Sequence, residues 1–148
     1  MRPSRRKVRW EFFAYALILG AIALWPTPVD RAGAGLLAKA LKGLHRRGMP
    51  GWIDYAFVES ASNVLLFVPL GALVVWVLGK RYWWAGALAG MLLSALIELA
   101  QFLFLPERYP TLLDVAANTA GATLGSLLTL LVLTLRKPVP NTPPRRTL

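Results

Sequence analysis

Long stretches without charge are the feature that most limits what this chain can fold into. Charged side chains are almost absent from four of them, at positions 12–29, 60–79, 82–105 and 115–135, and Glu98 is the single exception. The hydrocarbon core of a bilayer, about 30 Å thick, requires roughly 20 residues of helix. The strands of a membrane barrel would instead alternate apolar and polar residues. The sequence therefore predicts an all-α polytopic membrane bundle of about four transmembrane helices.

Composition and charge narrow the classes of partner. Hydrophobic residues make up 56% of the 148 residues, and the net charge is +10. Lys and Arg lie at the chain ends and between the apolar stretches, as orientation determinants and lipid-surface contacts do. We therefore expect membrane lipids as partners and no nucleic acid. The absence of cysteine excludes disulfides, thiolate metal sites and thiol nucleophiles. The apolar stretches also lack histidine and clusters of metal ligands, so neither a metal nor a cofactor is expected.

The first apolar stretch follows a cluster of Arg and Lys residues, a pattern that signal peptides share. Ala32-Gly33-Ala34 offers a small-residue cleavage pattern, but the segment Trp25–Pro28 is typical of the interfacial end of a helix. We therefore predict an uncleaved first span, Phe12–Trp25. Arg31–Gly48 repeats apolar residues at helical spacing with basic residues between them. This pattern predicts a short amphipathic helix on the membrane surface, with a solvated loop helix as the alternative.

The remaining three spans are predicted at Tyr55–Leu78, Trp83–Leu105 and Thr111–Arg136. Pro69 lies inside the second span and removes a backbone donor, so a kink is expected there. The proline-rich basic tail, 138–148, is predicted to be disordered, which leaves 1–137 as a single transmembrane domain. Counting basic residues places both termini and the Lys80-Arg81 turn in the cytoplasm. The five Lys and Arg residues of the first loop argue for the opposite orientation.

Polar side chains inside the spans are costly unless they have a partner or a function. Six residues in or beside the last three spans are the candidates for ligand binding: Asn63, Glu98, Gln101, Arg108, Asp114 and Asn118. Consecutive spans run in opposite directions, so the second and fourth spans begin level with the end of the third. We therefore expect polar faces from three helices to meet in the extracytoplasmic leaflet. Arg108, in the adjacent loop, is the expected cation for Glu98 or Asp114.

A purely structural role is the alternative for several of these residues. Asn63, Gln101 and Asn118 can hydrogen-bond across helices, and Asp114 can cap the fourth helix. For Glu98 a function is favoured, because a carboxylate in a span is expensive. Small residues at helical spacing let helix backbones approach closely. We assign structural roles to six residues: Pro69, Gly71, Gly86, Gly90, Gly121 and Gly125.

Three blocks of sequence stand out in the last three spans: Asn63–Gly71, Glu98–Gln101 and Arg108–Gly121, the last followed by Gly125. In this order, within a core at 59–125, they resemble the VanZ-like family. The resemblance implies a polytopic bacterial membrane protein. The namesake of that family is linked to low-level resistance to the glycopeptide teicoplanin. The resemblance implies no catalytic role for any residue.

Three functions are compatible with these residues. The favoured one is binding or moving a polar-headed envelope lipid, or a lipid-linked cell-wall intermediate, at the outer leaflet of the bacterial cytoplasmic membrane, with an effect on teicoplanin susceptibility. The second is an intramembrane enzyme with Glu98 and Asp114 as general acid and base. It is less favoured because no cysteine and no intramembrane histidine is available. The third is an accessory subunit of a membrane complex, or a homo-oligomer.

Overall fold

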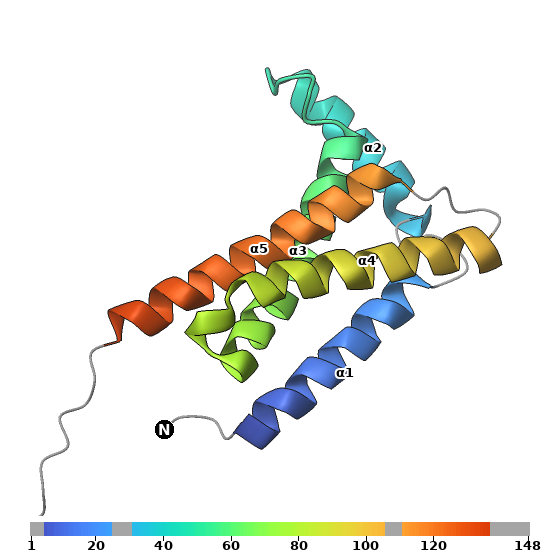
Figure 1. The fold of residues 1–148 in the computed structure, drawn as a ribbon. Helices are drawn as coiled ribbons and strands as arrows, with labels where there is room; N and C mark the ends of the chain where they lie inside the picture. Colours follow the sequence, from blue (N-terminus) through green and yellow to red (C-terminus); the bar gives the residue numbers. More distant parts are fainter. Residues whose placement is uncertain (1–4, 25–30, 106–110, 137–148) are drawn as a thin grey trace, which may run out of the picture.

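The computed structural model describes residues 5–24, 31–105 and 111–136, and these are mostly helical (Figure 1). Five α-helices and one 3-10 turn follow in chain order: α1 Arg5–Ala23, α2 Arg31–His45, α3 Tyr55–Leu78, η1 Lys80–Tyr82, α4 Trp84–Phe104 and α5 Leu112–Leu135. These described ranges contain no strand, which confirms the all-α prediction. The proline-rich tail and the loop that holds Arg108 lie outside the described residues.

Three of the described helices, α3, α4 and α5, are long and apolar enough to cross a membrane. Their bounds agree with the predicted spans to within one or two residues. α1 has 19 residues, but five of its first seven residues are charged. It is not among the three helices that are long and apolar enough to cross a membrane. A multi-pass membrane protein is thus supported, whereas a fourth span at α1 stays a prediction.

Close approach of backbones holds α3 against α5. A Cβ atom added at Gly121 would collide with the backbone carbonyl of Val64, and one at Gly125 would collide with that of Val68. Gly71 faces the carbonyl of Ala122 in the same way. Helices that touch through their backbones gain van der Waals contact along their length. The structure therefore places these three glycines where α3 and α5 come close together, and the structural role assigned to them stays a prediction.

α4 packs onto this pair through the two other predicted glycines. Gly86 lies against the side chain of Ser126, and Gly90 lies against the methyl group of Ala122. Ser126 is fully buried, and its hydroxyl donates a hydrogen bond of 2.8 Å to the carbonyl oxygen of Ala122. Pro69, the remaining residue with a predicted structural role, lies inside α3, which continues through it to Leu78.

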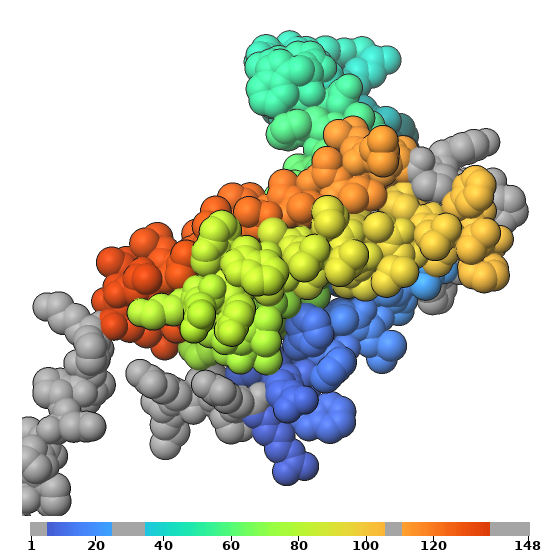
Figure 2. Space-filling model, in the orientation of Figure 1, coloured from blue at the N-terminus to red at the C-terminus, as the bar shows by residue number. Residues whose placement is uncertain are grey.

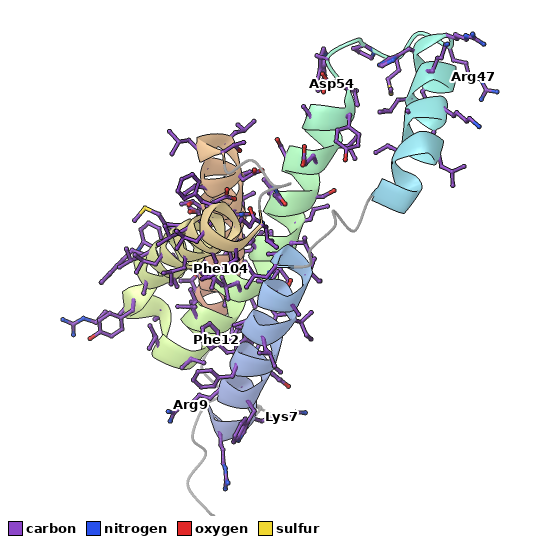
Figure 3. All side chains as sticks on the ribbon, turned by 90° about the vertical axis from the view of Figure 1, so that its right-hand side faces the viewer. Lys7, Arg9, Phe12, Arg47, Asp54 and Phe104 are labelled. Carbon is purple, nitrogen blue, oxygen red and sulfur yellow. The ribbon has the colours of Figure 1, made fainter. Side chains whose placement is uncertain are left out.

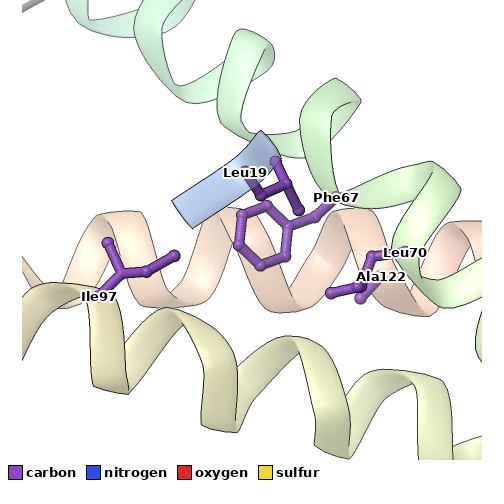
Figure 4. Packing of buried hydrophobic residues seen from close by; sticks show 5 residues of the cluster. All are labelled: Leu19, Phe67, Leu70, Ile97 and Ala122. Carbon is purple, nitrogen blue, oxygen red and sulfur yellow. The ribbon is translucent and has the colours of Figure 1, made fainter. Parts of the chain in front are cut away.

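One small apolar cluster joins all four long helices. Its buried members are Leu19, Phe67, Leu70, Ile97 and Ala122, which gather around the ring of Phe67 (Figure 4). Outside this cluster, many large apolar side chains of α4 and α5 are exposed. Figure 2 shows these two helices side by side on one face of the molecule. Leu96 and Phe102 are 62% and 71% exposed. Exposed apolar area of this extent is typical of a surface that another apolar phase covers, as acyl chains would here.

α2 lies beside the start of α3, at the end of the molecule opposite to the start of α1. Figure 3 shows Lys7 and Arg9 at one end and Arg47 with Asp54 at the other. Asp54 is the N-cap of α3, and its Oδ1 accepts a 2.9 Å hydrogen bond from the Phe57 amide. The helical conformation predicted for the first loop is thus present. Its placement on a membrane surface stays a prediction.

A hydrogen bond ties α1 to α3. The hydroxyl of Tyr15 donates to the backbone carbonyl oxygen of Leu66 at 2.6 Å. We expect Tyr15→Phe to lower the free energy of unfolding by about 0.6 to 1.7 kcal/mol, the average and the largest value measured for interhelical side-chain hydrogen bonds in a membrane bundle. Equilibrium unfolding of the purified protein in detergent micelles would measure this loss. Tyr82→Phe is the matched control, because its ring lies at the surface. Equal stability of the two variants would contradict the prediction.

Candidate functional site

Five of the six predicted ligand-binding residues line one cavity of about 590 Å³: Asn63, Glu98, Gln101, Asp114 and Asn118. The cavity lies where α3 and α5 begin and α4 ends, as the alternating direction of the spans predicts. α1 and Leu37 of α2 complete its wall. Arg108, the sixth residue, lies outside the described residues. The structure thus brings together the described candidates, whereas their functional roles stay predictions.

The start of α5 is the most densely hydrogen-bonded part of the cavity. Thr111 is the N-cap, and its Oγ1 accepts a 3.1 Å hydrogen bond from the Asp114 amide. The same hydroxyl donates to Asp114 Oδ2 at 2.7 Å. The Thr111 amide donates to Glu98 Oε2 at 3.0 Å. Glu98, on α4, therefore satisfies a backbone donor at the start of another helix, a position where helices leave amides unpaired.

The capping role considered for Asp114 is corrected by this arrangement. Thr111, not Asp114, caps α5, and Asp114 lies in the first helical turn. A threonine followed three residues later by an acidic residue is close to a capping box. In the usual motif the acidic side chain accepts the N-cap amide, but Glu98 takes that place here. Asp114 Oδ1 is therefore available to α3 and accepts a 2.7 Å hydrogen bond from Asn63 Nδ2.

Asn118 lies one turn deeper and is almost fully buried. Its Nδ2 donates to Ser94 Oγ at 2.8 Å, and the residue is 6% exposed. Its Oδ1 is buried and accepts no hydrogen bond from the part of the chain that the structure describes. A buried polar atom without a partner costs about 1–3 kcal/mol. The side-chain amide of Asn118 thus hydrogen-bonds to α4 through its nitrogen and also places an unsatisfied acceptor oxygen beside the cavity.

Gln101 connects the cavity to α1. Its Nε2 donates a hydrogen bond of 2.9 Å to the backbone carbonyl oxygen of Ala23, the last residue of α1. The last carbonyls of a helix have no partner within the helix, so Gln101 supplies one. Leu19, Ile22 and Ala23 then form one wall of the cavity.

The lining combines two kinds of surface. Carboxylates and amides from α3, α4 and α5 are joined by apolar groups such as Leu66, Phe67 and Ile97. Three of the lining residues are acidic, namely Glu59, Glu98 and Asp114, and none of the described lining residues is Lys, Arg or His. No three metal-binding side chains within residues 5–24, 31–105 and 111–136 are grouped closely enough to hold an ion. The arrangement suits an amphiphilic molecule whose polar part carries hydrogen-bond donors.

Two parts of the site were missed by sequence reasoning. Thr111 could have been found, because its spacing to Asp114 is a capping pattern. The contribution of α1 could not, because it consists of apolar side chains and one backbone carbonyl.

The cavity and most of the four long helices lie within a region that matches a known family. The model of the VanZ/LLP1 family matches residues 12–133, which extends the resemblance at 59–125 into α1 and almost to the end of α5. No curated protein and no solved structure matches the chain. Every residue that lines the cavity falls inside the matched region. The chain therefore belongs to the VanZ/LLP1 family.

Proposed function

We propose that this protein binds a polar-headed membrane lipid in the cavity between α1, α3, α4 and α5. One observation carries the proposal: polar groups from three helices converge beside apolar side chains in a space of about 590 Å³. This volume is in the range of sites that hold small molecules. A headgroup would occupy the polar part, and its acyl chains would follow the apolar surface of the helices.

The placement in the membrane is part of the proposal. In this proposal α1 also crosses the membrane, which makes four transmembrane helices with α3, α4 and α5. α2 lies on the membrane surface. The start of α1, the Lys80-Arg81 turn of η1 and the end of α5 lie toward one end of the molecule (Figure 1). Basic segments that share one end favour the cytoplasmic side. The cavity, at the other end, would then open toward the outer leaflet of the bacterial cytoplasmic membrane.

The chemistry of the lining supports a donor-rich headgroup. Carboxylate and amide oxygens accept hydrogen bonds from hydroxyl and amino groups. A lipid-linked cell-wall intermediate carries such groups. Binding it would change how much of it a glycopeptide such as teicoplanin can reach.

Native mass spectrometry of the protein purified from bacterial membranes tests lipid binding. We expect Glu98→Gln and Asn118→Ala each to lower the fraction of protein that carries a copurified lipid. The apparent affinity should fall about tenfold, which corresponds to ~1.4 kcal/mol. Each variant removes one of the polar groups that line the cavity.

Matched controls separate this loss from a general effect on the bundle. Glu11→Gln removes a carboxylate on α1 that pairs with Lys7 at 3.9 Å. Thr123→Ala removes a hydroxyl whose hydrogen bond goes to the Thr119 carbonyl of its own helix. Both controls should keep the lipid. If Glu98→Gln and Asn118→Ala keep every copurified lipid at wild-type occupancy, the proposal is wrong.

A further inference from the structure

We infer that the cavity selects lipids whose headgroup carries a primary ammonium group. This inference rests on the proposed function and names the class of its ligand. Three independent properties of the described lining support it: the sign of its charges, the occupied start of α5, and an excess of hydrogen-bond acceptors.

The charged groups of the lining residues that the structure describes are all of one sign. Glu59, Glu98 and Asp114 face the cavity, and the described lining residues include no basic side chain. Electrostatic interactions strengthen where apolar walls exclude water, and here Phe67 and Ile97 form part of those walls. Asp114 accepts its hydrogen bonds from the neutral groups Asn63 Nδ2 and Thr111 Oγ1, so its carboxylate would attract a cation and repel an anionic phosphate. The phosphate of a bound lipid is therefore expected to remain outside the cavity.

Two amides at the start of α5 are already bonded to side chains of the protein. Amides at the start of a helix normally attract anions, and α5 begins at this cavity. Here the Thr111 amide is bonded to Glu98, and the Asp114 amide is bonded to Thr111 Oγ1. A phosphate would have to displace these side chains to use those two donors.

Acceptors remain in excess once these bonds are made. The buried Oδ1 of Asn118 has no donor among the described residues. Each oxygen of Asp114 accepts one bond from a neutral donor, Asn63 Nδ2 or Thr111 Oγ1. A carboxylate oxygen can accept more than one bond, and a primary ammonium supplies three donors where a hydroxyl supplies one and a quaternary ammonium none. A primary ammonium therefore matches both the charge and the missing donors.

Four lipids with identical acyl chains separate the effect of positive charge from that of N–H donors. They are phosphatidylethanolamine, its N-acetyl derivative, phosphatidylcholine and phosphatidylglycerol. Each is titrated against the full-length protein in detergent micelles, and the bound fraction is read by native mass spectrometry. We expect phosphatidylethanolamine to bind at least about tenfold more tightly than the other three, as charged hydrogen bonds imply. Asn118→Ala and Asp114→Asn should reduce this preference to within about threefold. The control Thr123→Ala should keep it.

The outcomes distinguish the inference from the function on which it rests. If phosphatidylcholine binds as tightly as phosphatidylethanolamine, the cavity does not recognise ammonium donors. If the N-acetyl lipid or phosphatidylglycerol binds as tightly, positive charge is not what is recognised. Either result overturns the inference while lipid binding stands. If none of the four lipids binds in a way that depends on Asn118 or Asp114, the inference fails. The proposed function fails with it only if Glu98→Gln and Asn118→Ala also keep every copurified lipid at wild-type occupancy.

Discussion

Gly121→Ala and Gly125→Ala are each expected to lower the free energy of unfolding by about 1 to 3 kcal/mol, the usual cost of forcing extra atoms into a packed interior. At both positions the added methyl group would collide with a backbone carbonyl of α3, from Val64 and Val68 respectively. A flexible side chain could move aside, but a helix backbone cannot without separating the two helices. In an exposed helix the same change is favourable by up to about 1 kcal/mol, because alanine is the better helix former.

Gly20→Ala is the matched control for this experiment. Gly20 lies in α1, and an added Cβ there would meet nothing within 4 Å. We expect this variant to be at least as stable as the wild type. Unfolding by a denaturing detergent, followed by far-UV circular dichroism, would compare the three variants. If Gly121→Ala and Gly125→Ala are as stable as Gly20→Ala, α3 and α5 do not touch through their backbones.

The bounds of the spans could be predicted because charge and backbone signals coincide at their ends. α3 begins after Asp54, which caps it, and ends at Gly79, whose φ of 90° suits glycine. Gly79 is also the last residue of the stretch 60–79 from which charge is excluded. α1 lacks this agreement, since its helix starts at Arg5, well before the apolar stretch that begins at Phe12. Its helical range could not be predicted from hydropathy alone.

Most of the candidate site could be predicted because each polar residue stands out against an apolar background. The partners of these residues could not be predicted with the same success. Arg108 is the expected cation for Glu98 or Asp114 and lies outside the described residues, whereas the structure shows the Thr111 amide as a partner of Glu98. Gln101 likewise bonds to a carbonyl oxygen of α1. Backbone groups are present at every residue, so the sequence carries no signal for which of them a side chain will meet.

Asn63→Asp is expected to destabilise the bundle by about 2 to 4 kcal/mol. The hydrogen bond from Asn63 Nδ2 to Asp114 Oδ1, at 2.7 Å, joins α3 to α5. The substitution removes the donor and places two carboxylates in contact. Two like charges 4 Å apart repel by about 4 kcal/mol at an effective dielectric constant of about 20. Unfolding of the purified variant would measure the loss, with Asp54→Asn, which changes a carboxylate at the N-cap of α3, as a comparison of lower expected cost.

The reciprocal exchange Asn63→Asp/Asp114→Asn should recover at least half of that loss. The amide introduced at position 114 can donate to the carboxylate at position 63 while its oxygen still accepts the bond from Thr111 Oγ1, which Asp114 Oδ2 now accepts at 2.7 Å. Both contacts of Asp114 are thereby retained with the charge moved to α3. Residues in direct contact show coupling energies of about 0.5 to 3 kcal/mol in such cycles. Losses that simply add in the double variant would mean that Asn63 and Asp114 do not meet, and the polar network that joins α3 to α5 would be wrong.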